Sequence, residues 1–194
     1  MTQHLRIVSA LALGWLVMAP APALAIWINL SEAQRKEAMA YGVEHREKLL
    51  PEFNREWQVS GQEWVALLRT EFNALAYLAR IMAKRNQDPP AELVERIIEQ
   101  SRGGLDFAVM VSSQEKEYGE KVEVVLLFGE QRISPRETQV IRVPLKRPND
   151  GLFEAHVRYK FPLEGINLQG QVTLVVKGPD GREERFPFDL SKVR

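Results

Sequence analysis

Two histidines after residue 25 are the side chains with the most possible catalytic roles, because imidazole can act as an acid, a base or a metal ligand near neutral pH. His45 lies in Glu44-His45-Arg46-Glu47, and no second histidine follows one turn later, so the H-E-x-x-H zinc pattern is missing. His156 alternates with charged residues in a strand-like stretch. We therefore expect His45 on a solvated helix face and His156 in a polar contact across strands.

Nucleophilic and carboxylate chemistry finds little support in the motifs. The sequence has no G-x-S-x-G elbow, and Ser113-Gln114-Glu115-Lys116 matches S-x-x-K without its S-D-N and K-T-G companions, in a stretch expected to be a loop. Two carboxylates in a cleft can hydrolyse a glycan, but no spacing singles out a pair. Cysteine is absent, which excludes thiol catalysis, zinc–thiolate sites and iron–sulfur sites. We predict no catalytic residue, no metal ligand and no cofactor.

Aromatic residues provide the one candidate interaction surface, which consists of Trp27, Phe53, Arg55 and Trp57. Tryptophan and arginine in irregular segments are typical of recognition surfaces. They are equally typical of a hinge where helices dock on a sheet, and we favour that role. The short stretch 26–30 is apolar enough to add to a sheet edge, in its own chain or in another molecule.

The first 25 residues have the three parts of a secretory signal peptide. Arg6 is their one fixed charge, an apolar run covers residues 7–18, and Ala23-Leu24-Ala25 has the form of a cleavage site. The apolar run is too short to span a bilayer, and prolines interrupt the sequence after it. We expect cleavage after Ala25 and a periplasmic or secreted mature protein without a membrane span.

Charge is balanced over the whole chain, with 26 Lys and Arg against 26 Asp and Glu. A protein that binds nucleic acid usually concentrates basic residues in one patch, and neither half of this sequence does so. We expect no nucleic-acid partner.

The residues before Gly104 have helical periodicity and predict a three-helix segment. Capping boxes at Ser31-Glu32-Ala33-Gln34 and Ser60-Gly61-Gln62-Glu63 predict helices over about 31–50 and 60–82. Asp88-Pro89-Pro90 then predicts the start of a third helix, which Gly103-Gly104 ends.

After Gly104 the apolar period falls to two, which predicts a sheet. Six strands are expected, over about 105–111, 122–128, 138–145, 152–161, 172–177 and 183–190. Proline cannot donate to a strand ladder, so Pro144 and Pro187 place their strands at sheet edges or at strand ends. In the strand 152–161, the row formed by residues 154, 156, 158 and 160 is expected to face water. Short strands with regular turns predict a small antiparallel β-sandwich of immunoglobulin-like spacing, and the fold class is α+β.

We divide the chain into a signal peptide (1–25), a helical segment (26–104) and a β-sandwich domain (105–194). The junction at Gly103-Gly104 is too short for a flexible linker, so the last two are expected to unfold as one unit. The missing catalytic motifs favour a non-enzymatic protein-interaction module that binds another envelope protein. The alternative is a small carboxylate-based enzyme, or a binding protein for envelope glycans or a small ligand. The sequence makes no prediction of the oligomeric state.

Overall fold

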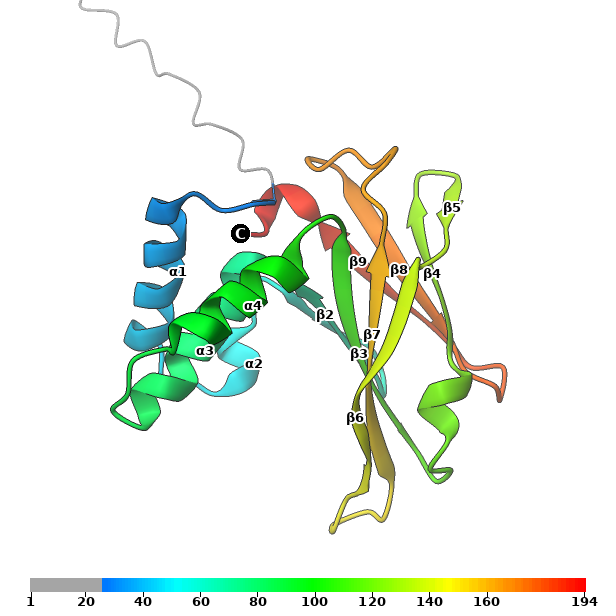
Figure 1. Ribbon diagram of the computed structural model, residues 1–194. Coiled ribbons are helices and arrows are strands. Elements are labelled where there is room, and N and C mark those ends of the chain that lie inside the picture. The colour runs from blue at the N-terminus through cyan, green and yellow to red at the C-terminus, as the bar shows by residue number, and fades with distance from the viewer. Residues whose placement is uncertain (1–25) are drawn as a thin grey trace, which may run out of the picture.

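The computed structural model describes residues 26–194, apart from the side chains of residues 142–145. Figure 1 shows the helices gathered on one side of the molecule and two sheets on the other. The helices are α1 (Glu32–Glu44), α2 (Leu50–Phe53), α3 (Glu71–Lys84) and α4 (Ala91–Ser101), with 3-10 turns η1 (Tyr118–Lys121) and η2 (Leu190–Lys192). The strands are β1 (Gln58–Ser60), β2 (Val65–Arg69), β3 (Leu105–Ser113), β4 (Glu123–Phe128), β5 (Gln131–Ile133), β6 (Glu137–Lys146), β7 (Phe153–Phe161), β8 (Gln171–Lys177) and β9 (Glu183–Asp189).

Both sheets are antiparallel and share one hydrophobic core. The five-stranded sheet has the order β1-β2-β3-β7-β6, and the four-stranded sheet has the order β5-β4-β8-β9. Val109 and Val157 of the first sheet are buried in the same cluster as Leu126, Leu174 and Phe186 of the second. We call the face of the five-stranded sheet that contributes to this core its inner face, and the opposite face its outer face.

The structure confirms the α+β class and the six strands predicted after Gly104, with ends shifted by one or two residues. Pro144 lies in β6 and Pro187 in β9, and each of these strands is at the edge of its sheet, as their missing N–H groups require. The turn at residues 178–181 connects β8 and β9 as expected. The three-residue strand β5 was not predicted.

The prediction of a helix over residues 60–70 is wrong. β1 and β2 occupy this stretch, and α3 begins only at Glu71, with the Thr70 side chain accepting a hydrogen bond from the backbone of Asn73. Instead of capping a helix, the N–H groups of Gln62 and Glu63 donate to the Glu184 carboxylate at 3.2 and 3.0 Å. A contact 121 and 122 residues away in sequence therefore overrides the local signal. Residues 26–104 consequently hold four helices and two strands, and the predicted three-helix segment is corrected.

The first capping box is confirmed, because Ser31 and Gln34 cap each other's backbone N–H groups at the start of α1. α1 ends at Glu44, earlier than predicted, and α2 is a separate single turn in which Pro51 occupies the first turn, where its missing N–H costs nothing. Where α1 crosses α3, a Cβ on Gly42 would lie 2.0 Å from the carbonyl oxygen of Ala76. The two helices approach this closely because residue 42 has no side chain.

Helices α3 and α4 form the connection between β2 and β3, which are direct neighbours in the sheet. The five-stranded sheet therefore takes strands from both sides of Gly104. The polar row of β7 is only half-buried rather than turned to water as expected, because α4 ends beside it. Arg158 and Lys160 donate to the carbonyl of Gln100 in the last turn of α4, at 3.2 and 2.9 Å. Within residues 26–194, no helix has the length and apolar character needed to cross a membrane.

Candidate functional site

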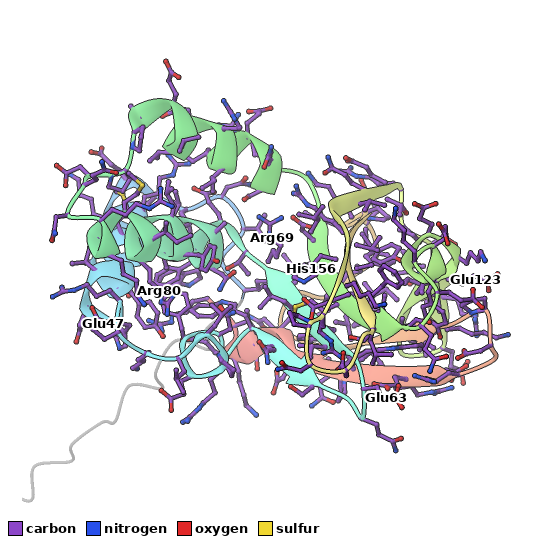
Figure 2. All side chains as sticks on the ribbon, turned by 90° about the horizontal axis from the view of Figure 1, so that it is seen from below. Glu47, Glu63, Arg69, Arg80, Glu123 and His156 are labelled. Carbon is purple, nitrogen blue, oxygen red and sulfur yellow. The ribbon has the colours of Figure 1, made fainter. Side chains whose placement is uncertain are left out.

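A groove of about 650 Å³ lies between α2, α3 and α4 and the outer face of the five-stranded sheet. Figure 2 shows Arg69 and His156 in the space between the helices and the strands. The groove is lined by Leu50, Asn54, Gln58, Leu67, Arg69, Asn73, Ala74, Tyr77, Leu78, Ile81, Ile97, Ala108, Met110, Ile141, Glu154 and His156. This volume is in the range of ligand-binding pockets in proteins.

The surface of the groove is mostly apolar. Alternate residues of neighbouring strands put Leu67, Ala108 and Met110 on the same face, and β2 pairs with β3 in the register that brings them together. Tyr77 and Ile81 contribute one face of α3, since residues four apart lie one above the other on a helix. The side chain of Tyr77 is 38% exposed, so part of this apolar surface is in contact with water.

A cluster of charges lies beside the groove around Asp106, which is 3% exposed. Arg158 donates to both carboxylate oxygens of Asp106, with Nε 2.7 Å from each. Arg69 is further away, with Nη1 3.9 Å from Oδ2 of the same carboxylate. Burial lowers the pKa of the Arg69 guanidinium from its ordinary value, which Asp106 opposes and Arg158 reinforces. One carboxylate therefore compensates two guanidinium groups, and Arg158 holds most of its hydrogen-bonding capacity.

Another polar pair lies on the same face. His156 Nε2 is 2.8 Å from Oε1 of Glu154, two residues away on β7. The expected polar contact of His156 exists, but it runs along its own strand rather than across strands. Among the described residues that line the groove there is no serine, threonine or cysteine beside this pair.

The candidate interaction surface of the sequence is divided by the structure. Phe53 and Trp57 have no exposed surface and pack with Tyr41 and Phe72, at ring-centroid distances of 5.6 to 6.3 Å. The Trp57 indole N–H also donates to the carbonyl of Arg194 at 2.8 Å. These contacts bury both residues among the helices, and they correct the assignment of Phe53 and Trp57 to a surface.

The other two members of that surface lie elsewhere. Trp27 is half-buried and its ring packs edge-on against Phe72 at 5.7 Å. Arg55 is exposed and lines a separate depression of about 240 Å³ with Tyr41 and Glu56. The stretch 26–30 forms no strand, and it is held by the burial of Ile26 and Leu30 in the core. The structure thus does not place the four predicted residues on one surface.

The remaining motifs have local roles. The ring of His45 stacks on Tyr41 at a centroid distance of 4.1 Å, and its Nδ1 lies 2.9 Å from the Tyr41 carbonyl oxygen. Ser113 is the last residue of β3, and Lys116 follows in a loop, so the S-x-x-K match is not at a helix start. Within residues 26–194, no group of three or more His, Asp or Glu side chains is arranged to hold a metal ion.

The groove residues were missed because the sequence does not reveal which helix covers which face of the sheet. The sequence predicts a helix at Arg69 and a polar row of β7 that faces solvent. The sequence carries one signal, because Leu93, Val94, Ile97 and Ile98 have the spacing of one apolar helix face. In the structure only Ile98 of α4 is buried. A helix with an incompletely covered apolar face indicates an open surface next to it.

Comparisons with known proteins leave the family open. No protein-family model matches the sequence, and no curated protein matches it. Among solved structures, the chain is similar to a protein of unknown function from Burkholderia pseudomallei K96243, at 11% sequence identity. The match covers 84% of this chain and 95% of that chain, with a TM-score of 0.48. The groove is therefore the feature from which the function is inferred.

Proposed function

We propose that this protein is an exported, non-enzymatic interaction module, and that the groove binds a segment of another envelope protein. The observation that carries the proposal is the groove itself, which is mostly apolar and has charged groups at its margin. Apolar grooves bordered by polar residues are typical of surfaces that bind other proteins. Glu154 is the one carboxylate among the described lining residues, so they do not supply the pair of carboxylates that a glycosidase needs.

Two matched truncations test this function. Tyr77→Ala removes an exposed aromatic side chain from the groove, and Leu49→Ala removes an exposed apolar side chain that does not line it. Tagged protein is crosslinked in the envelope of its native host, and co-purified proteins are quantified by mass spectrometry. We expect a stoichiometric partner whose recovery falls about fivefold or more with Tyr77→Ala, since aromatic anchors often contribute over 1 kcal/mol, and is unchanged with Leu49→Ala. Recovery of the protein without any partner, or equal recovery by both variants, contradicts the proposal.

Export to the periplasm is part of the same proposal. Its support is the sequence of residues 1–25, which lie outside the described part of the structure. We expect the native protein to begin at Ile26, and intact-mass measurement checks this. An N-terminus upstream of Ile26 contradicts cleavage after Ala25.

We further propose that the two sheets form an immunoglobulin-like sandwich. In such a fold, strands A, B, E and D form one sheet, and C, F and G, with C′ in some members, form the other. The orders β2-β3-β7-β6 and β5-β4-β8-β9 correspond to A-B-E-D and C′-C-F-G, with β1 added beside A. On this assignment α3 and α4 are an insertion between strands A and B, and the groove lies under the insertion.

A binding protein for a small ligand is the second candidate, and the volume of the groove favours it. A volume of about 650 Å³ is sufficient for a small molecule. Native mass spectrometry of protein purified from its host separates the two, because a retained small ligand adds a defined mass to the chain.

A further inference from the structure

Arg69 has an unusual electrostatic position for a side chain at the margin of an apolar groove. Its side chain is 27% exposed, and its closest carboxylate atom, at 3.9 Å, belongs to Asp106, which Arg158 already binds through two shorter contacts. Among the residues that the structure describes, no hydrogen bond from the Arg69 guanidinium is found. The partly buried Arg69 guanidinium has five N–H donors and shares its nearest carboxylate with Arg158. It can therefore bind a further anion in a bidentate geometry.

Polar groups are distributed through the groove rather than confined to its end at Arg69. Asn54 and Asn73 are both more than nine-tenths buried, line the groove, and are joined by a hydrogen bond of 3.2 Å. Gln58 and His156 line it too. An alkyl chain would remove water from the half-buried Gln58 and His156 and offer no hydrogen bond in return, whereas a peptide carries an N–H and a C=O at almost every residue. The distribution therefore favours a peptide over an acyl chain.

We infer that the groove binds an apolar peptide segment of a partner protein, and that an Asp or Glu side chain of this segment pairs with Arg69. This inference rests on the proposed function and adds the chemistry of the partner. The apolar residues of the segment pack on Leu67, Met110 and Tyr77, and its backbone groups meet the amides that line the groove. The carboxylate of the segment supplies the counter-ion that Asp106 provides only in part.

The test places a photoreactive benzoylphenylalanine in the full chain at position 77, and at position 123 as a control. Tyr77 is an exposed aromatic residue of the groove, so the substitution changes little, while Glu123 is exposed on the far side of the molecule (Figure 2). After irradiation in the native host, adducts are identified and the crosslinked segment is sequenced by mass spectrometry. We expect a protein adduct from position 77, absent from position 123, whose segment is apolar and contains Asp or Glu.

Dependence on the guanidinium is tested in the same strain. Arg69→Gln removes the cation and keeps a hydrogen-bonding side chain, and Arg55→Gln makes the same change at an exposed arginine outside the groove. Because a hydrogen bond to a charged group is lost, we expect Arg69→Gln to reduce the adduct yield by about tenfold or more. Arg55→Gln should leave the adduct yield unchanged. The melting temperature of each variant is measured, so that a folding defect is recognised.

The outcomes separate a failure of the proposed function from a failure of this inference alone. No protein adduct at position 77 overturns the proposed function, and with it this inference. A protein adduct that Arg69→Gln does not reduce, or whose segment has no acidic residue, overturns only the inference. An adduct with an acyl carboxylate in place of a protein overturns both. Should Arg69→Gln fail to fold, a synthetic peptide of the crosslinked segment is titrated against the parent protein. Replacing its acidic residue by the amide should weaken binding by about tenfold or more, and equal binding overturns the inference.

Discussion

The contact between α1 and α3 allows a sharp test of the structure, because two ordinary effects of one substitution have opposite signs. Gly42 lies inside α1, where alanine is favoured over glycine by about 1 kcal/mol. The added Cβ, however, would lie 2.0 Å from the carbonyl oxygen of Ala76 and 3.0 Å from the Cβ of Ala79. Since Cβ atoms essentially never come within 3.0 Å of another heavy atom, the helices must separate by about 1 Å.

The size of the destabilisation caused by Gly42→Ala depends on the group that obstructs the new methyl group. A backbone carbonyl in a helix cannot rotate away, so the cost should lie near the upper end of the 1–3 kcal/mol that overpacking usually costs, at about 3 kcal/mol. Subtracting about 1 kcal/mol of helix propensity leaves Gly42→Ala destabilised by about 2 kcal/mol. For a protein of this size, that corresponds to a melting temperature lower by about 4–8 °C.

Urea denaturation followed by tryptophan fluorescence measures this difference. Ala40→Gly, at an exposed position of the same helix, is the matched control and should be destabilised by about 1 kcal/mol through propensity alone. If Gly42→Ala is as stable as the parent protein, or more stable, the close approach of α1 and α3 described above is refuted.

Three further predictions concern single side chains. Arg158→Ala leaves the buried carboxylate of Asp106 with the distant Arg69 alone and should lower the free energy of unfolding by about 3–5 kcal/mol in urea denaturation, where a loss below 1 kcal/mol would contradict the role given to this pair. Thr70→Val removes both hydrogen bonds of the Thr70 hydroxyl, the cap of α3 and the bond to the Arg194 carbonyl, and should cost about 1 kcal/mol or more. Thr70→Ser should retain most of the stability, and equal melting temperatures for the two variants would argue against both bonds. The pKa of the Asp180 carboxyl is lowered by the backbone N–H of Arg182 and by the Tyr118 hydroxyl. The stabilising effect of this carboxylate is therefore present above its ordinary pKa and is lost as the pH falls through the lowered value. Tyr118→Phe should raise the pKa of Asp180 in an NMR titration, and an unchanged value would exclude the hydroxyl as a cause.

The sheets could be predicted from the sequence because their residues obey a local rule. Alternation of apolar and polar residues fixes which side chains of β7 face the core, and Pro187 fixes β9 at an edge, without reference to the rest of the chain. α4 could be placed for a similar reason, since Pro90 and Gly103 mark its two ends.

The stretch that became β1 and β2 could not be predicted in this way. Its apolar residues suit a helix as well as a strand, and the Ser60 box suits a helix start. The contacts that decide between them come from elsewhere in the chain: Glu184 binds the N–H groups of residues 62 and 63, and β3 pairs with β2. The candidate site depends on the same long-range contacts, because Arg69 reaches the groove only when its segment is a strand beside β3.

The position of α3 and α4 in the chain has a consequence for how this fold can diversify. The chain leaves the five-stranded sheet at Arg69 and returns at Leu105, and Arg69 lies opposite Asp106 in the register of β2 and β3. A connection that begins and ends at adjacent backbone positions can change in length or sequence without breaking a hydrogen bond between the strands of the sheet. α4, of which only Ile98 is buried, can therefore change more freely than α3, whose Phe72 and Leu75 belong to the hydrophobic core.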